Sequence, residues 1–117
     1  MGEAFVDYMT MPGKLSSIRV VISIAERMPE LGEEFYRLGP CVGIAKMKAY
    51  FDAQVARGGL RPHDTEHAAT QFLDLCLSGV LKPALFGHKG DIASERKRYV
   101  VESAVRMFMA AYGPDTA

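Results

Sequence analysis

An apolar run in the C-terminal third limits what this chain can fold into. Residues 72–81, from Phe72 to Leu81, place apolar side chains at consecutive helical positions instead of along one stripe. A helix that is apolar on every face must be buried on more than one side. A domain of 117 residues offers a single core. We therefore expect a second molecule to cover the other side, which predicts an obligate helical homodimer.

The composition fits one globular domain and argues against several classes of protein. Fourteen basic and fourteen acidic residues cancel, whereas DNA-binding domains carry a basic surplus or face, so these residues alone should not bind DNA. The basic residues 96–98 are interpreted as a solvated helix face or the rim of a dimer contact. No apolar run reaches the roughly 18 residues of a membrane helix. Cys41 and Cys76 lie far apart in apolar surroundings, which predicts free thiols in a reducing cytoplasm.

The spacing of apolar residues predicts an all-α fold, a bundle of about five to six helices forming a single domain over residues 1–117. Asp64 and Asp91 are the expected N-caps of the last two long helices. Pro83 is expected to kink or end the helix that Asp64 begins. After a helical segment within Met1–Met11, the expected helices are Leu15–Met28, Pro29–Leu38, Cys41–Arg57, Asp64–Leu81 and Asp91–Tyr112.

An ordered set of segments along the chain resembles a known family. Residues 27–40 read RMPELGEEFYRLGP, and the agreement continues at residues 59–61, 64–69, 72–79 and 104–113. This set resembles the C-terminal regulatory domain of TetR-type transcriptional regulators, specifically the AcrR/AefR-like branch. The resemblance implies dimerisation through the last two long helices. It also implies a small-molecule pocket that controls an N-terminal helix-turn-helix.

The DNA-binding helices of that family have no counterpart in this sequence. Too few residues precede Pro12 to hold a three-helix module, and they are not basic. We therefore expect a regulatory domain without its DNA reader, from a fragment or a late-starting gene. Contact with DNA is expected only through a helix-turn-helix outside these residues.

Signatures of enzymes and metal sites are missing from the sequence. It contains no G-x-S-x-G, Walker or H-E-x-x-H motif. His63 and His67 could chelate a metal only with a third ligand from Asp64 or Glu66, so a solvated helix start is the favoured interpretation. We expect no catalytic activity, no cofactor and no metal ion.

Methionine and aromatic side chains are the best indication of a ligand. Seven methionines, six phenylalanines and five tyrosines would give a pliable, polarisable interior. We expect a cavity between the Leu15–Met28, Cys41–Arg57 and Asp64–Leu81 helices that takes an apolar or aromatic small molecule. Ordinary core packing is the alternative for each residue. The candidate lining residues are Met9, Met11, Ile18, Ile22, Met47, Tyr50, Phe51 and Phe72, with Arg19, Tyr36, Tyr50 and Gln71 as polar candidates.

Two functions follow from these patterns. The favoured one is the ligand-sensing and dimerisation domain of a TetR-type repressor, in which the ligand selects one arrangement of the helices. The alternative is a dimerisation module with a filled core and no ligand. In both, the expected apolar centre of the dimer consists of Leu73, Leu77, Val80, Val101, Val105, Phe108 and Met109.

Overall fold

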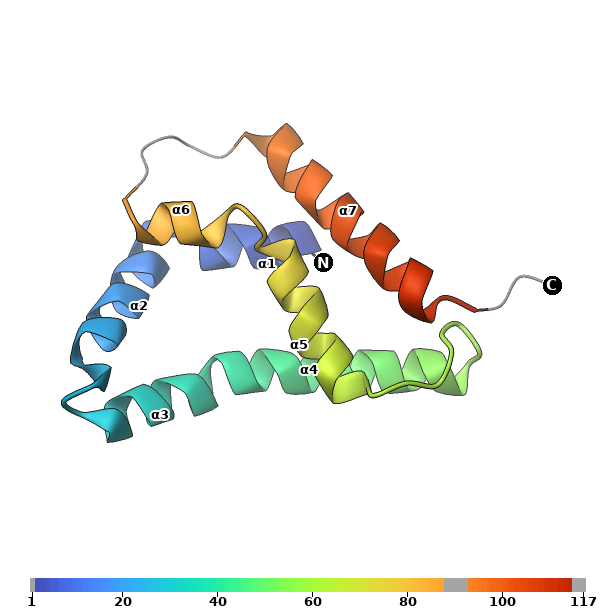
Figure 1. Ribbon diagram of the computed structural model, residues 1–117, viewed down its shortest axis with the longest axis horizontal. Helices are drawn as coiled ribbons and strands as arrows, with labels where there is room; N and C mark the ends of the chain where they lie inside the picture. The colour runs from blue at the N-terminus through green and yellow to red at the C-terminus, as the bar shows by residue number, and fades with distance from the viewer. Residues whose placement is uncertain (1, 88–92, 115–117) are drawn as a thin grey trace.

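The computed structural model describes residues 2–87 and 93–114, which form seven α-helices (Figure 1). They are α1 (Gly2–Met9), α2 (Pro12–Ala25), α3 (Pro29–Leu38), α4 (Pro40–Ala56), α5 (Thr65–Cys76), α6 (Leu81–Leu85) and α7 (Ser94–Tyr112). The predicted all-α fold is confirmed. In the described part of the chain, no helix is long and apolar enough to cross a membrane.

Prolines and glycines set most helix boundaries. Pro12, Pro29 and Pro40 each occupy the first helical position, where the missing N–H would have no partner in the helix. Met28 precedes Pro29 and leaves helical geometry, with φ −132° and ψ 70°. The helix α2 ends at Ala25, three residues before the expected Met28. Gly58, with φ +79°, follows the C-cap of α4, in keeping with the expected end of that helix.

The expected helix Asp64–Leu81 is interrupted, which corrects the sequence-based prediction. Asp64 is the N-cap and accepts a hydrogen bond from the backbone N–H of His67, but α5 ends at Cys76. Gly79 then adopts φ +71°, which is open to glycine at little cost. Pro83 lies at the third position of α6, where its missing N–H costs no helical hydrogen bond. Pro83 therefore lies in the first turn of a helix and does not end one.

Two connected clusters form the hydrophobic core. The first joins α4, α5 and α7 around Met47, Phe51 and Phe108; the rings of Phe51 and Phe108 are stacked with centroids 4.4 Å apart. The second joins α1, the end of α5 and the start of α7 around Val6, Cys76 and Val80. Phe72 packs against both clusters. The interruption after Cys76 thus buries Val80 within the chain.

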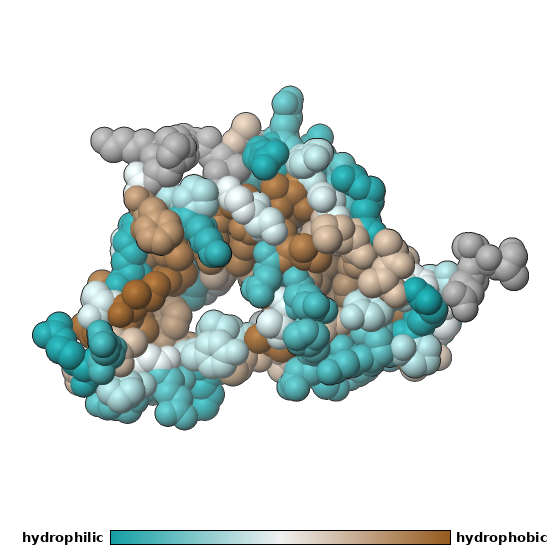
Figure 2. Space-filling model, in the orientation of Figure 1, coloured by the Kyte–Doolittle hydropathy of each residue, from teal (hydrophilic) through white to brown (hydrophobic). Residues whose placement is uncertain are grey.

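The molecule is thin and open. Its principal extents are 52 × 34 × 17 Å and its radius of gyration is 15.9 Å, against roughly 13 Å for a compact domain of this length. Its accessible surface of 7974 Å² is roughly 1,700 Å² more than that of a compact monomer of this size. In Figure 2 the molecule is hollowed between α2 and the α3–α4 edge. The core alone therefore does not cover the apolar side chains of this chain.

Candidate functional site

The first two helices after α1 form an arm that stands off the core. We call Pro12–Leu38, that is α2 and α3, the α2–α3 arm. Within the chain, α2 packs mainly on α3, with smaller contacts to α1 and α6. Leu15 is the one buried residue of α2, and no residue of α3 is buried. The apolar inner face of the arm is therefore left uncovered by the core.

A cavity of about 550 Å³ lies between the arm and α1, α4, α5 and α6; we call it the central cavity. Its size falls within the range of small-molecule sites. Its polar lining consists of Tyr8, Lys14, Lys46, Thr70 and Asp74 beside the backbone of Gly39 and Gly43. The rest of the lining is apolar and consists of Phe5, Met9, Ile18, Phe35, Leu38, Pro40, Val42, Ile44, Leu73, Leu77 and Leu81.

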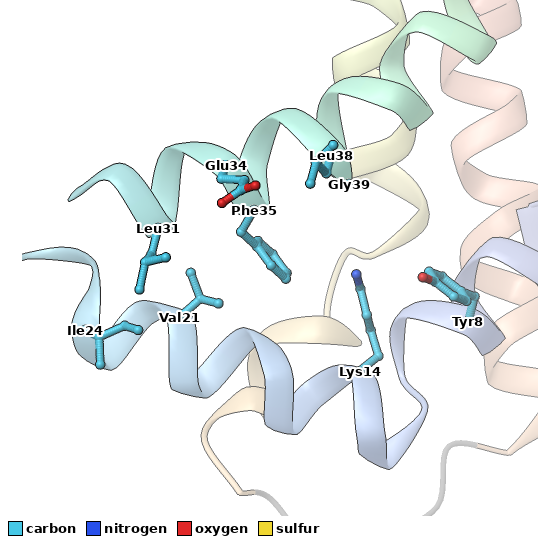
Figure 3. Close-up of a pocket in the computed structure, with 9 residues that line it drawn as sticks. All are labelled: Tyr8, Lys14, Val21, Ile24, Leu31, Glu34, Phe35, Leu38 and Gly39. Carbon is cyan, nitrogen blue, oxygen red and sulfur yellow. The ribbon is translucent and has the colours of Figure 1, made fainter. Parts of the chain in front are cut away.

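A second hollow of about 410 Å³, the arm cavity, lies between α2 and α3 (Figure 3). Val21 and Ile24 of α2 face Leu31 and Phe35 of α3 across it. Five residues line both cavities, so the two meet at one place. These shared residues are Tyr8, Lys14, Phe35, Leu38 and Gly39.

Lys14 provides the charge at this junction. Its Nζ lies 5.3 Å from the centre of the Tyr8 ring and 4.9 Å from that of Phe35, within the range of cation–π attraction. In Figure 3 its side chain extends from α2 between these two aromatic residues. Within the described part of the chain, Lys14 makes no hydrogen bond or ion pair. The junction thus holds an ammonium group whose neighbours are aromatic rings.

The candidate ligand residues are divided among three environments. Met9 and Ile18 line the central cavity. Met47, Phe51 and Phe72 pack in the core instead, because their side chains fill the space between α4, α5 and α7. The side chains exposed on the surface, outside both cavities, are Met11, Arg19, Ile22, Tyr36, Tyr50 and Gln71.

Arg19 was expected to bind a ligand, but its side chain binds the protein backbone instead. Its Nε donates a hydrogen bond to the carbonyl of Leu85 over 3.0 Å, and its terminal nitrogen donates to that of Ala84. These carbonyls belong to the end of α6, and that of Ala84 also accepts a hydrogen bond from the backbone N–H of Gly87. Arg19 therefore ties α2 to α6.

The candidate dimer residues are divided in the same way. Val80 and Phe108 are 1% and 7% exposed, so they are core residues and offer almost no surface to a partner. Val101 is half-buried against the core. Leu73 and Leu77 line the central cavity. Val105 and Met109, each 43% exposed and one turn apart on α7, remain available to a second molecule.

Sequence reasoning missed most of the cavity wall although a signal was present. Leu31, Phe35 and Leu38 recur along one side of α3, and Tyr8 ends the apolar stripe of α1. Such a stripe is also what core packing requires. Periodicity marks which face is apolar; whether a core or a cavity lies beside it depends on the neighbouring helix.

Other polar clusters have structural roles. Lys97 pairs with Asp7 over 2.6 Å and Arg98 with Glu3 over 3.7 Å, which ties α7 to α1. His63 stacks on Tyr112 at 4.1 Å between centroids, away from His67 on the exposed face of α5. In the described residues, no group of three or more histidine, cysteine or acidic side chains could hold a metal ion. The expected N-cap Asp91 lies outside those residues.

Comparison with known proteins identifies relatives of this fold. The family model for the C-terminal domain of AefR-like transcriptional repressors matches residues 1–114. A TetR-family transcriptional regulator from Mesorhizobium loti is similar at a TM-score of 0.89, with 23% identity over 96% of this chain and 55% of its own. The flavonoid-responsive regulator FrrA has a TM-score of 0.82, with 24% identity over 99% of this chain and 62% of its own.

A third solved structure, a TetR-family regulator from Pseudomonas syringae pv. tomato, has a TM-score of 0.72 and 26% identity over 92% of this chain and 54% of its own. No curated protein matches the sequence. The chain thus spans between 54% and 62% of the length of these three structural relatives.

Proposed function

Because this chain belongs to the family of AefR-like transcriptional repressor C-terminal domains, we propose that it senses a small molecule and dimerises on behalf of a TetR-type repressor. The ligand is an apolar or aromatic compound that occupies the central cavity. The DNA-binding helix-turn-helix it controls is not among these residues. The setting we propose is the cytoplasm.

The single observation that carries this proposal is the uncovered apolar volume between the arm and the core. A filled domain would pack α2 against α4 and α5, whereas here a cavity of about 550 Å³ separates them. Its mostly apolar wall with a few polar groups is typical of small-molecule sites. The flavonoid-responsive regulator shares the fold at 24% identity, so the ligand class is argued from this cavity and not from that relative.

The arm gives the ligand a route to the N-terminal end of the domain. Helix α1 packs on α2, α5 and α7, so the position of the arm against α5 affects how α1 is held. A ligand can shift this arrangement only as far as its affinity for the two arrangements differs. A coupling of about 1–3 kcal/mol is usual. In a complete regulator, this shift would reposition the DNA-binding helices.

Binding of the neutral dye anilinonaphthalene tests the proposal, with its fluorescence and the melting temperature of the protein as readouts. Selective binding to the folded chain should raise the melting temperature. Gly43 lines the cavity, and a Cβ added there would meet no atom within 4 Å. Gly43→Phe should therefore fold, occupy part of the cavity and weaken dye binding at least tenfold.

Gly13→Phe is the matched control, because Gly13 is an exposed helical glycine that lines neither cavity and has equal space around it. It should leave dye affinity unchanged. If the dye does not bind the unmodified chain, or binds both variants as tightly, the cavity is not the ligand site. The alternative of a dimerisation module without a ligand would then be favoured.

A further inference from the structure

We propose that the ligand of this domain is an aromatic anion whose acidic group binds Lys14 at the junction of the two cavities. This inference rests on the proposed function and specifies the chemistry of its ligand. The acidic group could be a carboxylate, a sulfonate or an ionised phenol, since all three present anionic oxygen to an ammonium. The aromatic part would occupy the apolar central cavity.

The ammonium group of Lys14 lies where the two cavities meet. Lys14 lies in the first turn of α2 and lines both cavities, so a molecule in either one can reach it. The rings of Tyr8 on α1 and Phe35 on α3 lie 5.3 and 4.9 Å from its Nζ. Three helices therefore meet around the ammonium group. Rings at these distances orient an ammonium, yet they supply no negative charge to neutralise it.

The charge of Lys14 has no ion-pair partner among the described residues. Lysines that have no ion pair usually extend their ammonium group into water. Here the side chain is half-buried and turned between two rings, while no described carboxylate lies within ion-pair distance. A ligand anion would supply the missing opposite charge, and attraction between charges is stronger beside a half-buried ammonium group than at a fully exposed one.

The other charges around the cavities fix where the anion would lie. Asp74 lines the central cavity and Glu34 lines the arm cavity, so an anion beside either one is disfavoured. Lys46 also lines the central cavity, but its side chain is exposed and has no aromatic neighbour among the described contacts. This distribution leaves the shared junction as the favoured position for negative charge.

Two dyes that differ by one sulfonate group test the inference. Anilinonaphthalene and its sulfonate share one aromatic skeleton, and fluorescence titration gives the affinity of each. Removing the ammonium with Lys14→Met keeps most of the apolar stem. It should weaken sulfonate binding five- to tenfold and change binding of the neutral dye less than twofold. Lys14→Arg, which restores the charge, should recover most of the sulfonate affinity.

Lys82→Met is the control for net charge, because Lys82 is exposed and lines neither cavity; it should change neither affinity. Failure of the neutral dye to bind the unmodified chain contradicts the proposed function itself, whereas failure of the sulfonate alone refutes the anionic ligand. If both bind and Lys14→Met affects them equally, or affects neither, the cavity stands and the anionic ligand is refuted. A sulfonate loss confined to Lys46→Met would refute it as well.

Discussion

The two cysteines have different chemistry because their positions differ. Cys76 is fully buried between α1 and α7, and this desolvation raises the pKa of its thiol to about 11. Cys41 is partly exposed in the first turn of α4. Since the thiolate is the reactive form, both burial and the raised pKa should protect Cys76 from alkylation and oxidation.

We predict that Ellman's reagent modifies one thiol per chain rapidly at pH 8, and the second only when denaturant unfolds the protein. With a pKa of about 11, Cys76 is ionised to roughly 0.1% at that pH. Thiol counting in the native and unfolded states is the measurement, and Cys41→Ser should remove the fast reaction. Two fast thiols in the native state would contradict the burial of Cys76.

At the scale of single residues, sequence reasoning identified side-chain types better than side-chain positions. Met47 and Phe51 have the same apolar character as Ile18, yet they fill the core while Ile18 borders the cavity. The difference arises because side chains of α5 and α7 pack on Met47 and Phe51 of α4, whereas a cavity separates Ile18 of the arm from the core. Such pairing between distant helices is not encoded in local periodicity.

At the level of whole helices, the sequence predicts the helix ends that a residue at the end itself determines. It does not predict the ends that depend on packing against distant helices. Pro29, Asp64 and Gly58 mark helix ends through their own backbone or side-chain chemistry. The end of α5 at Cys76 has another cause, because the turn at Gly79 buries Val80 beside Val6. In the sequence, that turn appears as a glycine within an apolar run that also fits a helix.

The interruption after Cys76 removes one reason to expect a dimer, but α7 still offers an apolar surface for one. The apolar run no longer needs a partner on every face, since Val80 is covered within the chain. Tyr99, Val105, Met107 and Met109 of α7 are nevertheless exposed. Val105 and Met109 share one face, and one helix paired with its copy around a two-fold axis would cover both.

We predict that the unmodified chain is a dimer at micromolar concentration and that Val105→Glu weakens this dimer at least tenfold. Because Val105 is exposed and outside both core clusters, the variant should remain a folded, helical monomer. Sedimentation equilibrium with circular dichroism measures both properties. Met11→Glu, at an exposed residue just before the arm, is the matched control and should stay dimeric. A chain that is monomeric without any substitution would refute the interface.

At the scale of the whole molecule, the shape supports both parts of the proposed function. An excess surface of roughly 1,700 Å² over a compact monomer is more than the roughly 800 Å² that each partner contributes to a standard interface. Part of the excess lies at the hollow between the arm and the core (Figure 2), and part lies along α7. A bound molecule and a second chain would therefore cover different regions.

In the proposed function, a small molecule occupies the cavity between the α2–α3 arm and the core. A crystal structure of the chain with anilinonaphthalene bound tests it most directly, because it locates the molecule without a variant. We expect the dye to lie against Ile18, Leu73 and Leu77, which line that cavity. Dye found only on the outer face of α7, or a cavity closed by the arm packing onto α4 and α5, would contradict it.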